Sequence, residues 1–169
     1  NEGYEVIKKL AARSDIVIAS YKPGDDKKLR VSYEELSAIN KKIIYGRITG
    51  YGPLNDRVGY DAVLQAESGF MSMNGEEGGP PIKMPVALID VLAAHQLKEG
   101  LLIALLKRQQ TGEGSFVDVS LLQSAVASLV NQASNWLVGG NIPVRQGSLH
   151  PNIAPYGEWF EAADDKRIL

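Results

Sequence analysis

The chain has 169 residues, 44% of them hydrophobic and 22% charged, and its 18 basic and 20 acidic side chains give a formal net charge of -2. This balance excludes a strongly basic nucleic-acid-binding protein and a largely disordered chain, and no apolar run reaches the ~18 residues of a membrane helix. Cys is absent, which excludes a disulfide framework and a thiol nucleophile and favours a reducing compartment. We therefore expect a cytoplasmic protein without membrane or nucleic-acid partners.

Helical and extended patterns alternate in the first third of the chain. Ser32 is followed three residues later by Glu35, a capping-box pattern that marks a helix start. The β-branched run DIVIAS before a Pro-Gly turn is typical of a buried strand. The predicted elements are a helix at 3–13, a strand at 15–20, a helix at 32–40, a strand at 41–49 and a glycine-punctuated loop at 49–53.

The longest predicted helix covers residues 89–110 and ends in basic residues just before Gly112. Its middle, GLLIALL, is apolar on every side, so we expect this helix to be buried all round. Strands that alternate with helices indicate an α/β fold with a Rossmann-like open parallel sheet and flanking helices. The other elements predicted here are a helix at 59–73, a Gly/Pro-rich loop at 74–81, a strand at 115–120 and a helix at 121–138.

From Gly139 the chain changes to a Pro- and Gly-rich stretch without periodicity. We therefore divide it into a large α/β domain at 1–138, a linker at 139–151 and the start of a smaller domain at 152–169. The chain also begins with Asn instead of Met and ends on DKRIL, so we expect it to be a piece of a longer protein.

Asp90 is the most informative acidic residue, because it lies at the predicted start of the long helix among apolar neighbours. A carboxylate in such a segment is costly to bury unless the free N–H groups and partial positive charge of a helix N-terminus compensate it. One interpretation makes Asp90 the N-cap of the helix. The other makes it an ionised, partly desolvated nucleophile. The residues alone leave both open.

Cations gather directly after the first predicted strand, at Lys22, Lys27, Lys28 and Arg30. Ligands of open α/β sheets bind beyond the carboxyl ends of the strands, so these cations could meet an anionic ligand there. The glycines of the 49–53 loop, at the same sheet edge, would let a ligand approach the backbone. The alternative is a solvated charged loop, partly neutralised by neighbouring aspartates.

Signatures of hydrolases and metalloenzymes are absent, since neither GxSxG nor HExxH occurs. His95 lies in the long predicted helix, where we expect a satisfied core histidine, and His150 lies in the Pro-rich linker. We therefore predict no metal site and no Ser-His-Asp triad.

Several segments, in this order and spacing, resemble the class III CoA-transferases, a family that includes formyl-CoA transferase, carnitine CoA-transferase and the α-methylacyl-CoA racemases. The similarity covers most of the chain. The matching segments are 14–24, 36–52, 57–81, the helix of Asp90, 108–129 and the linker segment 141–156.

The resemblance implies that Asp90 is the catalytic nucleophile of an acyl-CoA:carboxylate CoA-transferase. In the implied mechanism Asp90 attacks an acyl-CoA thioester, giving a mixed anhydride and then an aspartyl-CoA thioester, and the incoming acid reverses these steps. Acyl-CoA and a free carboxylic acid are then the small-molecule partners, coenzyme A is a substrate, and no cofactor is permanently bound.

The family also implies which residues contact CoA. Ser20 and Lys28 depart from it, because the family often has Asn and Arg there, and Lys offers a point charge instead of a bidentate fork. The implied CoA-binding residues are Ser20, Tyr21, Lys28, Gly50, Tyr51, Gly52, Arg57, Tyr60 and Asp61.

Tyr60 separates the branches of the family. Racemases resemble this chain but carry His in a G-H-D motif where this sequence reads Gly59-Tyr60-Asp61. A phenol keeps its proton at neutral pH and is a poor base toward a carbon acid, which disfavours a racemase. An α-methylacyl-CoA racemase or epimerase and a non-catalytic CoA-binding module are the alternatives to CoA transfer.

Members of the resembled family are more than twice as long as this chain. We therefore expect a central fragment that lacks the first strand–helix units, most of the small domain and the closing C-terminal segment. The resemblance further implies a homodimer of two interlocked chains with shared active sites.

Overall fold

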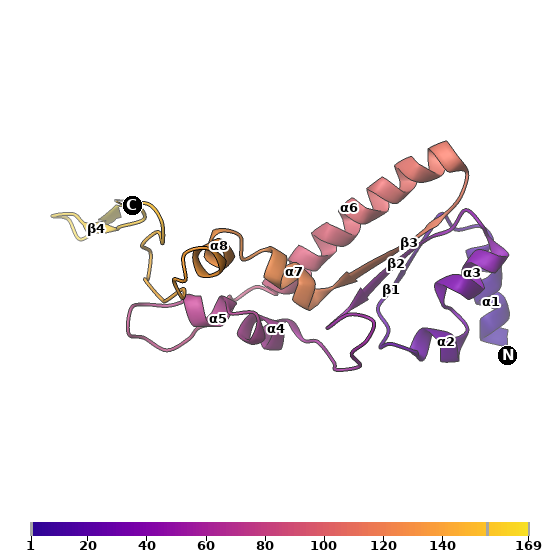
Figure 1. Ribbon diagram of the computed structural model, residues 1–169, viewed down its shortest axis with the longest axis horizontal. Coiled ribbons are helices and arrows are strands. Elements are labelled where there is room, and N and C mark those ends of the chain that lie inside the picture. The colour runs from indigo at the N-terminus through magenta and orange to yellow at the C-terminus, as the bar shows by residue number, and fades with distance from the viewer. Residues whose placement is uncertain (1, 155, 169) are drawn as a thin grey trace.

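The computed structural model describes residues 2–154 and 156–168. Asn1 and Leu169, the ends on which the expectation of a fragment partly rests, lie outside the described residues, as does Pro155 of the predicted small domain. The molecule is elongated, with a parallel sheet and its helices at one end and a small hairpin at the other (Figure 1).

Eight helices and five strands occur in the described ranges. In chain order they are α1 (Glu2–Ala11), β1 (Ile16–Ala19), α2 (Asp25–Leu29), α3 (Tyr33–Ile39), β2 (Ile44–Thr49), α4 (Asp61–Glu67), α5 (Phe70–Met73), α6 (Leu88–Thr111), β3 (Ser115–Ser120), α7 (Leu121–Ala127), α8 (Asn131–Leu137), β4 (Phe160–Glu161) and β5 (Arg167–Ile168).

The first three strands form one parallel sheet in the order β1-β2-β3. Ile16 lies opposite Ile44, and Ile44 lies opposite Ser115, so the amino ends of the three strands are level. Their carboxyl ends meet at the other edge of the sheet, which faces α4 and α7 (Figure 1). The predicted α/β fold with an open parallel sheet and flanking helices is confirmed.

Helices α1 and α3 cover one face of the sheet. The predicted capping box is present, because the Ser32 hydroxyl accepts a hydrogen bond from the Glu35 N–H and the Glu35 carboxylate accepts one from the Ser32 N–H, at 3.4 and 3.1 Å. This cap fixes the start of α3 and directs Leu36 into the core. The core on this face is formed by Ala11, Ala19, Leu36, Ile43 and Tyr45.

Helix α6 covers the opposite face and approaches the sheet closely at two glycines. A Cβ on Gly46 would lie 2.9 Å from Leu97, and one on Gly100 would lie 2.6 Å from Val117. A side chain at position 100 would overlap the stiff Val117, and one at position 46 would force Leu97 to move, so these glycines let α6 lie close to β2 and β3. These two close contacts fix the position of α6 against the strands.

The prediction that α6 is buried on every side is wrong. Leu102, Ile103 and Leu106 are 53, 67 and 61% exposed, whereas Leu97 and Leu101 are buried against the sheet. Three strands cover one side of the helix only, so its second apolar side faces outward.

Two predicted helices are each divided in two. Gly69, with a φ of 94°, separates α4 from α5, and Val130, with a φ of 43°, separates α7 from α8. Glycine adopts a positive φ readily, whereas a β-branched residue such as Val130 is strained at one. The short helix α2 was missed, because its DDKKL sequence follows a Pro-Gly pair that predicts a turn.

The C-terminal part of the chain contains no helix or strand between residues 139 and 151. Beyond it, β4 and β5 pair antiparallel as a small hairpin. The division into domains at residues 138, 139–151 and 152 stays a prediction. None of the helices in the described ranges has both the length and the apolar character needed to cross a membrane.

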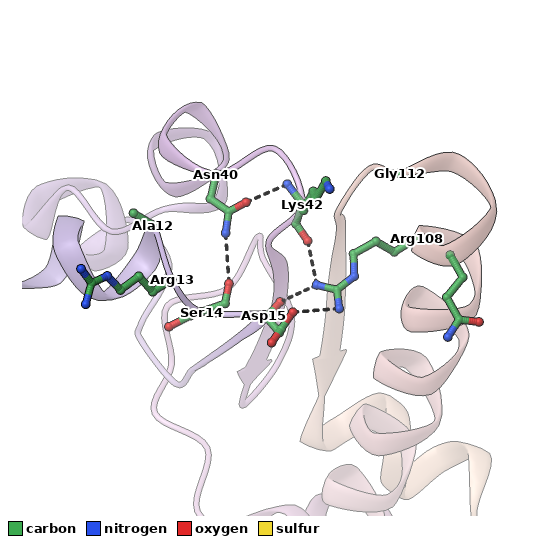
Figure 2. A pocket seen from close by; sticks show the side chains of 9 residues that line it. Ala12, Arg13, Ser14, Asp15, Asn40, Lys42, Arg108 and Gly112 are labelled. Atoms are coloured by element: carbon green, nitrogen blue, oxygen red, sulfur yellow. Dashed lines mark hydrogen bonds and ion pairs between the residues drawn. The ribbon is translucent and has the colours of Figure 1, made fainter.

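Arg108 of α6 fastens the amino ends of β1 and β2. Its guanidinium donates to the carbonyls of Lys42 and Asp15 at 3.1 and 3.4 Å and pairs with the Asp15 carboxylate at 3.0 Å (Figure 2). These contacts border a polar hollow of about 480 Å³. The hollow lies at the amino ends of the strands. Ligands of open α/β sheets bind at the opposite edge, beyond the carboxyl ends of the strands.

We expect Arg108→Met to lower the free energy of unfolding by about 1–3 kcal/mol, because it removes the side-chain donor of the Lys42 and Asp15 carbonyls and the ion pair with Asp15. Urea denaturation measures this change. Gln109→Ala, at an exposed position on the same rim, is the control and should unfold like the wild type. Equal stability of the Arg108 variant and the control would contradict the role of Arg108.

Candidate active site

Asp90 lies in the first turn of α6. Figure 1 shows that this end of the helix is the one at the carboxyl edge of the sheet. The N-cap of the helix is Ala87, which makes no side-chain cap hydrogen bond, so the interpretation of Asp90 as the N-cap is wrong. The residue is exposed, while Ile89 before it is fully buried. Among the apolar neighbours of Asp90, Ile89 faces the core while Val91 is 49% exposed, and the side chain of Asp90 itself faces outward.

The cap of α6 comes from Asp61 at the start of α4. One carboxylate oxygen of Asp61, Oδ2, accepts hydrogen bonds from the N–H groups of Ile89 and Asp90 at 2.7 and 3.3 Å. The neighbouring N–H groups of Leu88 and Val91 donate to backbone carbonyls. All four first-turn N–H groups therefore have acceptors, and the two that bond to a carboxylate hold Asp61, not Asp90 as we expected from the sequence.

Partial burial raises the pKa of the Asp90 carboxyl above its usual range, and the negative charge of Asp61 raises it further. A carboxylate with a raised pKa is a better base and nucleophile than an ordinary one, yet it needs a higher pH to ionise. The pairing of Asp61 with Asp90 thus affects both the position and the reactivity of the second carboxylate.

Asp61→Asn should lower the pKa of Asp90, because it removes one of the two causes of the upward shift while burial remains. The ionised fraction of Asp90 at acidic pH should then be larger than in the wild type. NMR titration of isotope-labelled aspartate carboxyl carbons measures this, with the Asp90 signal assigned by its loss in Asp90→Asn. A titration of Asp90 that is unchanged or moves to higher pH would contradict this electrostatic coupling.

Gln65 of α4 is fully buried and was not identified from the sequence. Its Nε2 donates to Asp61 Oδ1 at 2.5 Å and to the carbonyl of Val86 at 3.3 Å, and its Oε1 accepts from the N–H of Met84 at 2.8 Å. One side chain thus connects Asp61 with the segment that leads into α6. A Gln inside a short helical pattern gives no sequence signal for such contacts.

The loop after β2 folds back on itself through two glycines. A Cβ on Gly59 would lie 2.4 Å from the Cα of Gly50, so the two backbones touch. Gly52, with a φ of 94°, donates its N–H to the Thr49 hydroxyl at 3.1 Å, and the carbonyl of Gly50 accepts from Leu122 at 3.0 Å. This closure brings residues 60 and 61 to the carboxyl edge of the sheet.

Gly59→Ala should open this loop, because the added methyl group would overlap the backbone of Gly50. We expect a lower melting temperature, because the two backbones must move apart to admit the methyl group. Ala62→Gly, an exposed position three residues later, tests whether any small change here is equally harmful. A Gly59→Ala variant with the wild-type melting temperature would show that the close approach is dispensable.

Arg57 lies on this loop with partners of its own. Its guanidinium is 4.2 Å from the centre of the Tyr51 ring and forms an ion pair with Glu67 of α4. Tyr60, by contrast, is the N-cap residue of α4 with a 67% exposed side chain. Of the predicted CoA-binding residues on this loop, Tyr60 is the one whose ring is presented outward beside Asp61.

Two of the cations after β1, Lys28 and Arg30, already have partners within the chain. Lys28 pairs with Asp25 at 2.8 Å, an exposed pair that lowers the pKa of Asp25 and raises that of Lys28. Arg30 lies over the ring of Tyr4, with its guanidinium carbon 4.2 Å from the ring centre. Ser20 and Tyr21 follow β1 directly at the carboxyl edge and are exposed.

A further charged cluster lies on the sheet and was not identified from the sequence. Arg47 of β2 forms two hydrogen bonds with Asp118 of β3, at 2.9 and 2.8 Å, and lies 3.8 Å from Asp26. Arg47 and Asp118 are register partners in the sheet, so a correct strand pairing would have revealed the contact. The cluster connects β2 with β3 near their carboxyl ends.

The two histidines do not form a catalytic triad. His95 is exposed on α6, with Nδ1 3.0 Å from the Nζ of Lys98, so the expectation of a core histidine is wrong. His150 Nδ1 accepts hydrogen bonds from the N–H groups of Asn152 and Ile153. Across the ranges that the structure describes, no three His, Asp or Glu side chains are grouped so that they could hold a metal ion.

The fold and this carboxyl-edge site define an α/β protein with an exposed carboxylate at the start of its longest helix. A family model described as "CoA-transferase family III" matches residues 1–169, and the chain belongs to this family. The resemblance inferred from the sequence segments is thereby confirmed.

Curated relatives share this family. The chain is 39% identical over 171 residues to a succinate–glutarate CoA-transferase of Agrobacterium fabrum, covering 99% of this chain and 42% of that protein. It is 32% identical over 164 residues to an acetyl-CoA:oxalate CoA-transferase of Acetobacter aceti, covering 95% of this chain and 42% of the other. The chain thus spans less than half the length of these relatives.

Among solved structures, a CaiB/BaiF family protein from Brucella suis superimposes with a TM-score of 0.88 at 38% sequence identity. The match covers 98% of this chain and 44% of that chain. The described fold is therefore the arrangement that this part of the family adopts.

Proposed function

We propose that this chain supplies the nucleophile-bearing part of an acyl-CoA:carboxylate CoA-transferase, with Asp90 as the nucleophile. The observation that carries the proposal is the exposed Asp90 carboxylate, of raised pKa, on a helix start that Asp61 fixes at the carboxyl edge of the sheet. Ligands of open α/β sheets bind at this edge. The family of the chain supports the same chemistry.

In the proposed reaction, an Asp90 carboxylate oxygen attacks the thioester carbonyl carbon of acyl-CoA. The C–S bond breaks, which gives an acyl-aspartyl anhydride and CoA thiolate. The thiolate then attacks the aspartyl carbonyl carbon and the anhydride C–O bond breaks. The first carboxylate departs as the leaving group, and Asp90 is left as an aspartyl-CoA thioester. The incoming carboxylate repeats these steps in reverse and regenerates Asp90, so protons and electrons balance without a further reactant.

Asp90 attacks only as the carboxylate, since a protonated carboxyl is a weak nucleophile. The first-turn N–H groups of α6 are occupied, so the donors that stabilise the tetrahedral oxyanions come from elsewhere in the whole protein. The hydrogen bonds of Asp61 to the first turn of α6 can therefore stay in place during both acyl exchanges.

For CoA binding we propose the exposed residues at the carboxyl edge. Ser20 and Tyr21 would contact the nucleotide, and Lys28 would exchange its Asp25 partner for a phosphate. Gly50 and Gly52 would let CoA approach the loop backbone, and Tyr60 would lie beside the acyl group. Arg57 and Tyr51 would support that loop through their mutual contact.

Dicarboxylic acids are the acceptor class that the relatives' names suggest, since succinate, glutarate and oxalate all occur in them. We propose the same class for this chain. The interlocked homodimer, the cytoplasmic location and the absence of a bound cofactor stay predictions alongside it.

Replacement of the nucleophile tests the proposal. In the whole protein that contains this chain, Asp90→Asn should lower the rate of CoA exchange between succinyl-CoA and glutarate by about a thousandfold or more, because the covalent route is closed. Glu99→Gln, an exposed carboxylate on the same helix, is the matched control and should exchange at the wild-type rate.

Three results would contradict CoA transfer on Asp90. One is an Asp90→Asn variant that exchanges CoA at the wild-type rate. Another is uptake of deuterium from heavy water at the α-carbon of an acyl-CoA, in the absence of an acceptor acid, which would indicate a racemase. The third is saturable CoA binding without any turnover, which would indicate a non-catalytic binding module.

A further inference from the structure

We propose that Gln65 is a positioning residue for CoA transfer, which fixes the Asp61 carboxylate and the chain entering α6 so that Asp90 stays in its attacking position. This inference rests on the proposed function of Asp90. Gln65 touches neither reacting atoms nor CoA in the proposal, and it acts through Asp61 and through the segment before α6.

Both the nitrogen and the oxygen of the Gln65 amide have hydrogen-bond partners. Its side chain is 0% exposed, and a buried amide is costly unless its donors and its acceptor are paired. Nε2 donates to both Asp61 and Val86, and Oε1 accepts from Met84. A leucine would fill the same space in a core without this demand, so these contacts, and not simple packing, explain a glutamine here.

The contact with Asp61 fixes the direction of that carboxylate. Gln65 Nε2 holds Oδ1 at 2.5 Å, which leaves Oδ2 to accept from the N–H groups of Ile89 and Asp90. Without Gln65 the carboxylate could turn about its side-chain bonds and lose the second, longer hydrogen bond first. That longer bond is the one to the backbone of Asp90 itself.

The contacts with Met84 and Val86 fix the approach to the helix. Both residues belong to the segment between α5 and α6, which has no strand or helix of its own. Further along, α6 is held by packing of Leu97 and Leu101 on the sheet. The first turn, which carries Asp90, is packed into the core through Ile89 and is held in addition by Asp61 and Gln65. Loss of these polar contacts should therefore loosen the nucleophile without unfolding the helix.

The test uses kcat and KM of the whole protein with succinyl-CoA and glutarate. Gln65→Met removes all three hydrogen bonds at similar volume, and Gln65→Glu sets a carboxylate against Asp61. We expect kcat to fall about 10- to 100-fold in each, because small displacements of a nucleophile have effects of this size, while KM for acyl-CoA stays within about twofold.

A polarity swap provides the rescue. In the double variant Asp61→Asn with Gln65→Glu, the carboxylate introduced at position 65 can accept from both the amide introduced at position 61 and the N–H of Met84, whereas the hydrogen bond to the Val86 carbonyl stays lost, as it is in Gln65→Glu alone. The amide oxygen at position 61 can still accept from the helix N–H groups. We expect each single variant to be impaired and the double variant to recover at least about tenfold in kcat over Gln65→Glu alone. If Gln65→Met does not fold, the comparison of the double variant with Gln65→Glu still tests the positioning role.

Gln96→Met is the matched control. Gln96 lies on α6 six residues after Asp90 and accepts a hydrogen bond from Ser124 at 3.0 Å, with no contact to Asp61 or to the segment before α6 among the described hydrogen bonds, so its loss should reduce stability without changing kcat. A Gln65→Met variant with wild-type kcat, or equal kcat losses in both variants, would overturn the positioning role. Failure of the double variant to recover would overturn it as well.

Asp90→Asn, measured in parallel, separates this inference from the function on which it rests. An inactive Asp90→Asn together with fully active Gln65 variants overturns the positioning role alone. An active Asp90→Asn overturns the proposed nucleophile and the positioning role together.

Discussion

The carboxylate of Asp61 at the start of α6 is the interaction on which the rest of the site depends. It joins two helices through residues 28 and 29 positions apart in the sequence and satisfies two N–H groups that would otherwise be unpaired. Charge-assisted hydrogen bonds of this kind are stronger than neutral ones. Because Asp61 occupies these groups, Asp90 is free to point outward, and the pKa of its carboxyl is raised by partial burial and by the nearby negative charge of Asp61.

Features encoded within a few residues could be predicted from the sequence. The capping box of Ser32 and Glu35 and the left-handed Gly112 that ends α6 are both present as predicted. The three parallel strands also follow from short β-branched runs between helical segments. The family could be inferred because many weak motifs stand in one order, although each alone is unspecific.

Features that depend on which elements meet could not be predicted. The exposure of His95 and Ile103 results from a sheet that covers one side of α6, which no periodicity reveals. Gln65 is recognisable only once α4 lies beside the segment before α6, and the break at Val130 has no local signal. The role of Asp90 as a cap was wrong for the same reason, since the true cap comes from a distant residue.

Mass spectrometry after hydroxylamine trapping tests most directly whether Asp90 is the covalent nucleophile. The tryptic peptide of residues 84–98 contains Asp90 as its single acidic side chain, so a modification of a side-chain carboxyl in it can be assigned without ambiguity. During turnover with succinyl-CoA, hydroxylamine should convert Asp90 in this peptide to the hydroxamate, and omission of succinyl-CoA should prevent it. Turnover that leaves this peptide unmodified while another carboxylate is converted would contradict the assignment of Asp90.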